Sequence, residues 1–304
     1  MHRFLAGSLQ VDAITVPIAG LPAALNGLTI TQLSDLHYDG MRLSDRLLQE
    51  AIAASNALHP DIVVLTGDHV TDDPTPVHRL VKHLSQMKSN IGVFAILGNH
   101  DIYPSHARAT ITDAFTQAGI PVLWNQVIYP VWPELAFIGL ADLWSREFNP
   151  STVMNQIDAG IPRIVLSHNP DSAVHLQPWR VDLQISGHTH GGQIVLPGLG
   201  PFPSIYQKLR RYVPRKLRRW IPYMREDCYK VVKHWEWAQG FHRVGNNKLY
   251  VNRGLGTYFP GRCFCPPELT VFTLVPEESP YSVPQNSVLQ KVTQPEESKS
   301  AQLV

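Results

Sequence analysis

The chain is short of cysteine and of net charge, and each shortage excludes a class of protein. Its 304 residues include three cysteines, an odd number clustered late in the sequence, which gives neither a disulfide framework nor a Cys-x-x-Cys metal knuckle. A reducing compartment is the simpler expectation. The 26 basic and 25 acidic side chains leave a formal net charge of +1, so no global field draws the whole protein to nucleic acid.

Long apolar runs are also missing. No run approaches the ~20 residues that a membrane-spanning helix needs. Near the N-terminus, Asp12 interrupts the apolar stretch before the core of a signal peptide can form. We therefore expect a cytoplasmic protein. The sequence also lacks a Gly-x-Ser-x-Gly elbow and a Gly-rich phosphate loop, which argues against a serine nucleophile and against nucleotide-driven chemistry.

The apolar residues alternate between strand and helix patterns over most of the chain. Strands are predicted at 28–34, 61–67, 92–98, 163–167, 181–185, 248–254 and 268–275, and helices at 43–58, 76–87 and 106–119. Such alternation is typical of an α/β protein in which helices pack on a central sheet. We find no internal repeat and no linker between positions 20 and 276, which favours one domain.

Composition sets the expected boundaries of that domain. Residues 1–24 are predicted to be an N-terminal extension, and residues 25–276 the domain itself, with a basic insert at 205–223. Residues 277–304 are rich in Pro, Ser, Glu and Gln and poor in large apolar side chains. A segment of that composition is predicted to be a disordered tail.

Polar side chains follow five of the predicted strands, in the motifs SDLH, GDH, GNHD, SHNPD and GHTH. Ligands of an open α/β sheet bind at the carboxyl ends of its strands, so five separate segments deliver polar groups to one edge. Each motif alone has an ordinary explanation as a turn, a helix cap or a loop histidine, but the full set does not. The candidate ligands are Asp35, His37, Asp68, Asn99, His168, His188 and His190.

These side chains are carboxylates, an amide and imidazoles, without a cysteine. Such a mixture suits Mn, Fe or Zn rather than a soft thiolate site. Seven candidates are more than one ion needs. Two ions about 3.5–4 Å apart, bridged by one carboxylate, would use them all.

In this order and approximate spacing, the five motifs resemble the calcineurin-like metallophosphoesterases over residues 25–275. The run GHTHGGQI, followed by VNRGLGT and CPPELTVFTL, further resembles the bacterial YkuE/YaeI-like branch of phosphodiesterases. The resemblance implies a four-layer α/β/β/α sandwich with two divalent transition-metal ions, for which Mn is favoured over Fe and Zn. It implies hydrolysis of phosphate esters, and of phosphodiesters above all, by a hydroxide that bridges the ions.

The resemblance also implies a role for each residue of the motifs. The first ion would be held by Asp35, His37 and His190. The second ion would be held by Asn99, His168 and His188. Asp68 would bridge the two. His100 would be catalytic and face the substrate, and Asp101 would lie behind His100 as its orienting partner.

Two alternative functions stay open. One is a pyrophosphatase that cleaves UDP-2,3-diacylglucosamine, as some relatives of this family do. The other, from a different class, is a non-catalytic binding or scaffold module on the same fold, against which the complete set of motif residues argues. The metal core does not choose between monoester, diester and pyrophosphate, because the family uses one core for all of them.

Positive charge is concentrated in the segment KLRRYVPRKLRRW at 208–220. Positions 208–219 hold seven basic residues and no acid, and apolar residues recur there at helical spacing, although Pro214 argues against one continuous helix. Three interpretations stay open: a solvated surface helix, a strip that attracts anionic substrates, and a segment that holds the enzyme peripherally on an anionic membrane. Nucleic acid is a weaker competitor, because nothing else resembles a nucleic-acid module.

Overall fold

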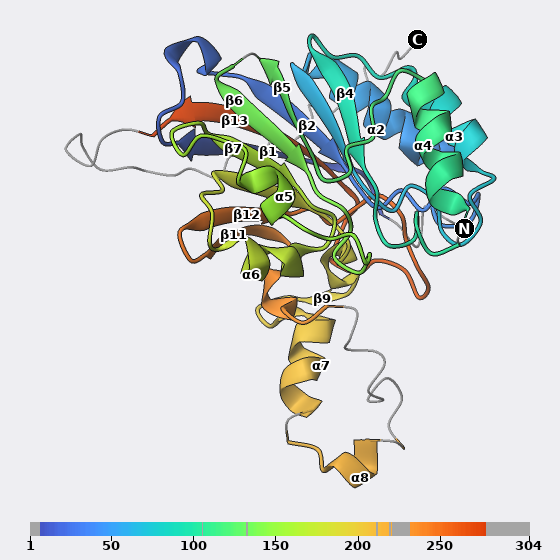
Figure 1. Cartoon of the computed structure of the whole chain (residues 1–304). Coiled ribbons are helices and arrows are strands. Elements are labelled where there is room, and N and C mark those ends of the chain that lie inside the picture. Colours follow the sequence, from blue (N-terminus) through green and yellow to red (C-terminus); the bar gives the residue numbers. More distant parts are fainter. Residues whose placement is uncertain are drawn as a thin grey trace, which may run out of the picture.

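Two β-sheets packed face to face form the centre of the computed structural model, and helices cover the outer face of each (Figure 1). The structure describes residues 7–104, 106–131, 133–210, 212–218, 220 and 232–277. The four layers confirm the expected α/β/β/α sandwich. Apart from residue 277, the tail predicted at 277–304 lies outside the described residues.

The first sheet has five strands in the order β1-β13-β2-β3-β4. They are β1 (Gln10–Ile18), β13 (Glu268–Pro276), β2 (Thr29–Leu33), β3 (Ile62–Thr66) and β4 (Gly92–Ile96). β2, β3 and β4 are parallel, and β13 runs antiparallel to β2. The outer face is covered by α2 (Asp45–Ala57), α3 (Val77–Leu84) and α4 (Ala107–Gln117).

The second sheet has six strands in the order β11-β12-β8-β7-β6-β5. They are β11 (Gly240–Val244), β12 (Asn247–Val251), β8 (Leu183–Ser186), β7 (Arg163–Leu166), β6 (Leu135–Gly139) and β5 (Gln126–Val131). The four central strands are parallel, and the two edge strands are antiparallel to them. Two short helices, α5 (Ser151–Met154) and α6 (Ala173–Leu176), pack on its outer face.

The β3 strand shows why its sequence is apolar throughout. Ile62 and Val64 point into the core between the two sheets, whereas Val63 and Leu65 point into the layer of α2, α3 and α4. Both faces of this sheet are covered, so both side-chain sets of a strand must be apolar. This continuous run made β3 easy to predict.

The first sheet takes in part of the predicted N-terminal extension. Residues Gln10–Ile18 lie within 1–24 and form β1, which pairs in parallel with β13 along its whole length. Val16 and Ile18 of β1 are fully buried between the sheets. The domain boundaries at 24 and 276 stay a prediction, and β1 belongs to the packed sandwich.

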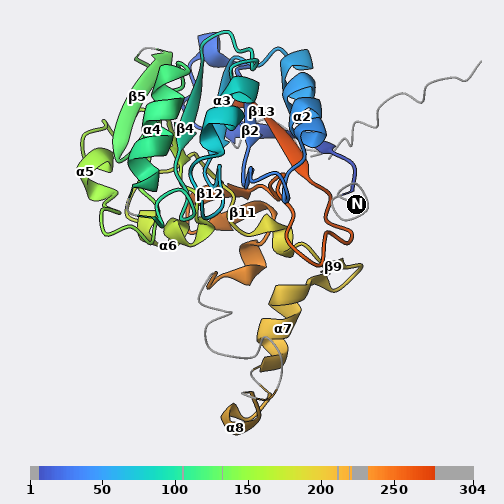
Figure 2. The same ribbon diagram turned by 90° about the vertical axis from the view of Figure 1, so that its right-hand side faces the viewer.

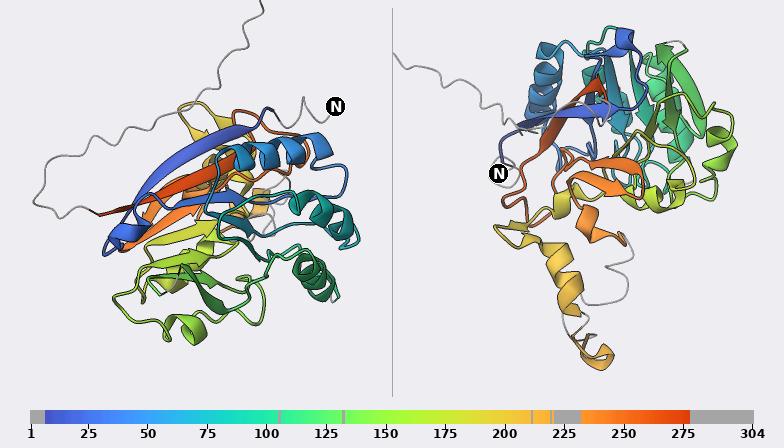
Figure 3. Two further views of the ribbon diagram at one scale, coloured as in Figure 1. Left: turned by 90° about the horizontal axis from the view of Figure 1, so that it is seen from above. Right: turned by 90° about the vertical axis from the view of Figure 1, so that its left-hand side faces the viewer.

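A helical arm extends from the sandwich beyond the hairpin of β9 (Val195–Leu196) and β10 (Gly200–Pro201) (Figures 1 and 2). The arm consists of α7 (Phe202–Arg210) and the short α8 (Arg215–Arg218), and it occupies the described part of the predicted basic insert. The right-hand view of Figure 3 shows α7 leading away from both sheets. Among the described residues, no helix is long and apolar enough to cross a bilayer.

The core between the sheets gives a test of the architecture. Phe137 of β6 is fully buried there, so Phe137→Ala is expected to lower the free energy of unfolding by about 3–5 kcal/mol. Chemical denaturation measures the loss. Phe241→Ala is the control, because that ring is 42% exposed on β11 and should cost less than about 1 kcal/mol. Equal losses in the two variants would contradict this packing.

Candidate metal centre

The loops that carry the predicted motifs bend sharply as they leave the strands. Nine non-glycine residues of the described chain have a positive φ, a left-handed conformation that costs of order 1–3 kcal/mol and clusters at functional sites. Five of the nine are candidate ligands: Asp35 (φ 50°), His37 (42°), Asp68 (52°), His188 (71°) and His190 (51°). The fold therefore stabilises these strained turns in order to point five side chains at one place.

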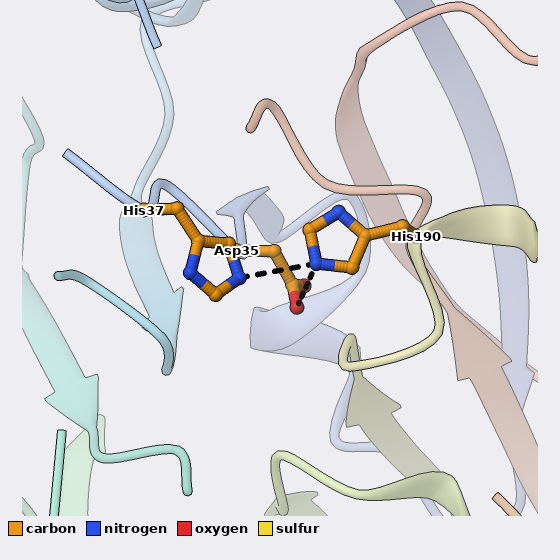
Figure 4. A group of neighbouring side chains, drawn as sticks. All are labelled: Asp35, His37 and His190. Atoms are coloured by element: carbon orange, nitrogen blue, oxygen red, sulfur yellow. Dashed lines mark hydrogen bonds and ion pairs between the residues drawn. The ribbon is translucent and has the colours of Figure 1, made fainter. Parts of the chain in front are cut away.

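Asp35, His37 and His190 form the first group of converging side chains (Figure 4). One ligand atom from each lies within 4.8 Å of the other two. The Nε2 atoms of the two histidines are 3.1 Å apart, and His190 Nε2 is 3.6 Å from Asp35 Oδ1. Buried nitrogen and carboxylate atoms that face one another in this way are suited to surround a cation.

The other ring nitrogens of this group are held from behind. His190 Nδ1 lies 3.2 Å from the Gly256 carbonyl oxygen, to which it can donate. His37 Nδ1 lies 3.1 Å from Tyr258 Oη. Such contacts fix the orientation of an imidazole and, where Nδ1 donates, leave the Nε2 lone pair free for a metal.

Asp68, His168 and His188 form the second group. His168 Nε2 lies 3.1 Å from Asp68 Oδ2 and 3.2 Å from His188 Nδ1, and His168 Nδ1 can donate to the Thr66 carbonyl oxygen at 2.8 Å. The same Asp68 Oδ2 also lies 3.6 Å from His37 Nε2 in the first group. One carboxylate oxygen thus stands between the two groups.

Asn99 follows β4 and is almost buried, with 8% of its surface exposed. Its Oδ1 atom has no hydrogen-bond partner among the described residues. An unsatisfied buried acceptor costs about 1–3 kcal/mol, and a cation would remove that cost. The unpaired amide oxygen, together with the facing imidazole nitrogens, fits a site that holds cations.

Charge and burial oppose one another at Asp68. Burial acts to raise the pKa of Asp68, but His168, His37 and His100 outweigh it and hold the pKa well below its usual range. Burial acts to lower the pKa of His168, but Asp68 reverses the direction and raises it to about 10. A proton on His168 and a cation beside it therefore compete for Nε2.

Burial also lowers the pKa of His37 well below its usual range, which keeps that ring neutral.

His100 lies beside both groups and differs from them in exposure. Its side chain is 31% exposed, and its ring centroid is 4.9 Å from that of His37. Its backbone N–H donates to Asp68 Oδ1 at 2.9 Å. The ring nitrogen Nδ1 lies 3.3 Å from the Thr71 carbonyl oxygen and 3.6 Å from Asp72 Oδ1. A molecule that enters from solvent can reach this histidine.

Asp101, which is predicted to orient His100, makes a set of contacts of its own in the structure. Its buried carboxylate accepts hydrogen bonds from the backbone N–H groups of Gly98, His69 and Val70 at 2.9–3.2 Å. Asp101 therefore ties the loop after β3 to the loop after β4. Among the described residues, Thr71 and Asp72 make the contacts with the His100 ring nitrogen instead. Neighbours in the chain point in different directions, which spacing in the sequence does not show.

Asp142 and Trp144 are site residues that sequence reasoning missed. Asp142 follows β6 and is 1% exposed, and its Oδ2 has no hydrogen-bond partner among the described residues. Burial raises the pKa of Asp142 to about 6, against the opposing charge of His168. The Trp144 ring packs against that of His188, with centroids 5.1 Å apart. Polar residues just after predicted strands were taken as candidate site residues. Asp142 would have been among them if β6 had been predicted.

The fold and this pair of groups define a metal-dependent phosphoesterase. The family model for "Calcineurin-like phosphoesterase" matches residues 28–192. Phosphodiesterase YaeI of Escherichia coli (strain K12) is 32% identical over 80% of this chain and 80% of its own length. The chain belongs to the calcineurin-like phosphoesterase family.

Two further relatives cover a similar share of the chain. The uncharacterized metallophosphoesterase YkuE of Bacillus subtilis (strain 168) is 30% identical over 88% of this chain and 85% of its own length. UDP-2,3-diacylglucosamine pyrophosphatase LpxG of Chlamydia trachomatis serovar D is 28% identical over 81% of this chain and 83% of its own length. The similarity therefore extends well beyond the motif residues.

Gly98 tests the close packing of the site. A Cβ atom at this position would overlap Asp68 Oδ1 and would lie 2.6 Å from the Asp68 backbone nitrogen. Gly98→Ala is therefore expected to displace Asp68 and weaken metal binding by about 10–100-fold, measured by titration calorimetry with Mn²⁺. Gly160→Ala is the control, since nothing lies within 4 Å of a Cβ there. If both variants bound metal like the original chain, Asp68 would not be a ligand.

Proposed function

We propose that this protein hydrolyses phosphodiesters at a binuclear metal centre in which Asp68 bridges two ions. Asp35, His37 and His190 would hold one ion. Asn99, His168 and His188 would hold the other. The observation that supports this assignment most directly is the single oxygen, Asp68 Oδ2, that lies within 3.1 Å of His168 Nε2 and 3.6 Å of His37 Nε2.

The donor set favours a hard or borderline divalent transition metal. Carboxylate, amide and imidazole donors suit Mn, Fe and Zn, and we propose Mn²⁺ as the first ion to test. When bound, such a pair of ions polarises the phosphoryl oxygens and makes a water molecule acidic enough to act as the nucleophile. Buried carboxylates and neutral imidazoles supply the negative charge and the lone pairs that hold the ions in place.

His100 is the proposed catalytic residue of the chain itself. It is partly exposed, whereas the histidines around it are buried, so it is the imidazole that substrate reaches first. Its contact with the Thr71 carbonyl oxygen favours the tautomer with the proton on Nδ1. We propose that His100, carrying a proton on both ring nitrogens, stabilises the charge that develops on the phosphoryl group or gives the proton of its other ring nitrogen to the leaving oxygen.

The name of YaeI supports a diester as the substrate, because that relative, 32% identical, is called a phosphodiesterase. A second candidate is cleavage of the pyrophosphate in UDP-2,3-diacylglucosamine, which the name of LpxG suggests. The arm of α7 and α8, with its basic residues, favours this lipid-bearing class over a small soluble nucleotide. A scaffold role is disfavoured, because the buried ligand groups are intact.

Three substrates compared side by side test the proposal. Bis(p-nitrophenyl) phosphate, p-nitrophenyl phosphate and UDP-2,3-diacylglucosamine are incubated with the metal-loaded protein, and product release is measured at several substrate concentrations. We expect the diester to have a higher kcat/KM than the monoester. A preference for the monoester would overturn the diester assignment, and a preference for the UDP-lipid would favour the second candidate. Hydrolysis of none of them would favour the scaffold.

The first prediction from this assignment concerns removal of the proposed bridging carboxylate, Asp68. Asp68→Ala is expected to lose both ions rather than one, because the carboxylate neutralises charge between two cations. Elemental analysis of the purified variant counts the ions. Asp158→Ala is the matched control, since that aspartate is exposed on the loop before β7. Two bound ions and near-normal turnover in Asp68→Ala would show that Asp68 is not the bridge.

Removal of the catalytic histidine is the second prediction. His100→Gln is expected to reduce kcat by roughly 10²–10⁴-fold for a diester with a poor leaving group, while two ions stay bound. The loss should shrink for a good leaving group such as p-nitrophenolate, which needs less protonation. Because His100 also lies within ligand distance of His37 and Asp68, loss of metal in this variant would reassign it as a ligand.

A further inference from the structure

The arm exposes apolar side chains that a free surface helix does not need. Phe202, Ile205, Tyr206 and Leu209 follow the spacing i, i+3, i+4, i+7 along α7 and so share one face of the helix. Even so, no described residue of α7 is buried. Leu209 is 54% exposed, and beyond the helix Leu217 is 55% and Trp220 75% exposed. Ile205 and Tyr206 are half-buried, so the apolar face of α7 is only partly covered, and the apolar side chains further along the arm are the most exposed.

Positive charge surrounds these apolar side chains. The seven basic residues at 208–219 stand in a stretch of sequence, 183–225, that contains no aspartate or glutamate. Because the whole chain carries +1, the remainder without these seven carries 1 − 7 = −6. The side chains of Lys208 and Lys216 are exposed. This asymmetry would orient the molecule so that the arm faces an anionic partner.

The base of the arm is packed directly on the metal centre. The 3-10 turn η3 (His190–Gly192) contains the candidate ligand His190 and contacts α7. A Cβ atom on Gly192 would lie 3.0 Å from Pro203 and 3.1 Å from Pro201, and the φ of this residue is +75°, so tight packing and backbone conformation both favour glycine between the turn and the arm. The Phe202 backbone N–H also donates to the Ile194 carbonyl oxygen at 2.8 Å. These contacts fix the position of the base of the arm relative to the candidate metal centre. A surface that binds the arm therefore lies at a defined distance from that centre.

We propose that the arm of α7, α8 and Trp220 binds an anionic lipid bilayer and brings the metal centre to phosphate esters carried by lipids. Basic side chains supply attraction to anionic headgroups. Leu209, Leu217 and Trp220 supply apolar area that enters the boundary between headgroups and acyl chains. The second half of this proposal rests on the proposed phosphoesterase function, and the first half does not.

A lipid surface fits the arm better than a nucleic acid does. Aliphatic side chains such as Leu209 and Leu217 gain nothing from a solvated polyanion, but they are stabilised by removal from water at a bilayer. An arm that only attracted small anionic substrates would need the charges and not the exposed leucines. The combination of both kinds of side chain on one arm favours the membrane.

Sedimentation with vesicles tests the binding itself. The full chain is mixed with vesicles of phosphatidylcholine alone, or of phosphatidylcholine with phosphatidylglycerol, at several salt concentrations. We expect binding to the anionic vesicles, weaker as salt rises. Lys208→Glu combined with Lys216→Glu is expected to lower the partition coefficient by at least about tenfold. The matched control, Lys82→Glu with Lys88→Glu, makes the same change of charge at two exposed lysines on and just after α3 and should bind nearly normally.

A second variant separates apolar insertion from charge. Leu209→Ser combined with Leu217→Ser keeps every charge, so its binding should be weaker while its dependence on salt is unchanged. An equal loss of vesicle binding in the variant Lys82→Glu with Lys88→Glu would show that binding depends on the net charge of the chain and not on the arm, which would contradict the proposal. No binding of the original chain to anionic vesicles at low salt, or tighter binding to single-stranded RNA than to the vesicles, would overturn the proposal.

Activity measurements keep the two proposals distinct. Arm variants should hydrolyse soluble bis(p-nitrophenyl) phosphate at the normal rate, but should lose activity on a phosphodiester presented in anionic vesicles. Loss of both activities would make the arm a structural support of η3. Vesicle binding without hydrolysis of any phosphate ester would refute the phosphoesterase proposal and leave the membrane-binding surface standing.

Discussion

A buried carboxylate shared between two groups of histidines is the constraint on which the site depends. Asp68 is 2% exposed, and a carboxylate taken out of water is costly unless positive charge or hydrogen bonds surround it. Here His168 and His37 approach one of its oxygens and the His100 backbone N–H approaches the other. Two sheets must therefore meet closely at one edge, because His168 comes from the second sheet and Asp68 from the first.

That close approach explains the glycines in the motifs. Gly98 and Gly187 each precede a predicted ligand, and a Cβ atom on Gly187 would overlap Asp35 and Ser34, as one on Gly98 would overlap Asp68. Gly67 stands against Gly98, where its Cβ would lie 2.6 Å from the Gly98 backbone nitrogen. The patterns GD, GNH and GHTH thus record a packing requirement. A metal centre at the junction of two sheets needs backbone without side chains beside its ligands.

The sequence predicted the parts of the fold whose pattern is local. β3 is apolar on both faces and follows a helix whose apolar residues recur at helical spacing. Its position, and that of Asp68 just after it, could therefore be predicted. β1 and β5, which were not predicted, each contain a proline, Pro17 and Pro130, a residue that is unfavourable within a sheet. Both lie at sheet edges, where a missing N–H is tolerated. The contacts of Asp101 with the loop after β3 could not be predicted, because no spacing in the sequence reports them. Its orienting role behind His100 stays a prediction.

The position of the arm follows from the same turn that carries His190. Two glycines with left-handed backbone, Gly191 and Gly192, directly follow the GHTH motif. The second of them leaves room for the prolines at the base of α7. A chain with almost no net charge can still carry a strong local field when its bases are gathered in one segment. Because α7 begins beside the turn that carries His190, the proposed attraction to an anionic surface would act close to the candidate site. The proposed arrangement would couple recognition of a surface to hydrolysis without any change in the residues of the candidate metal centre.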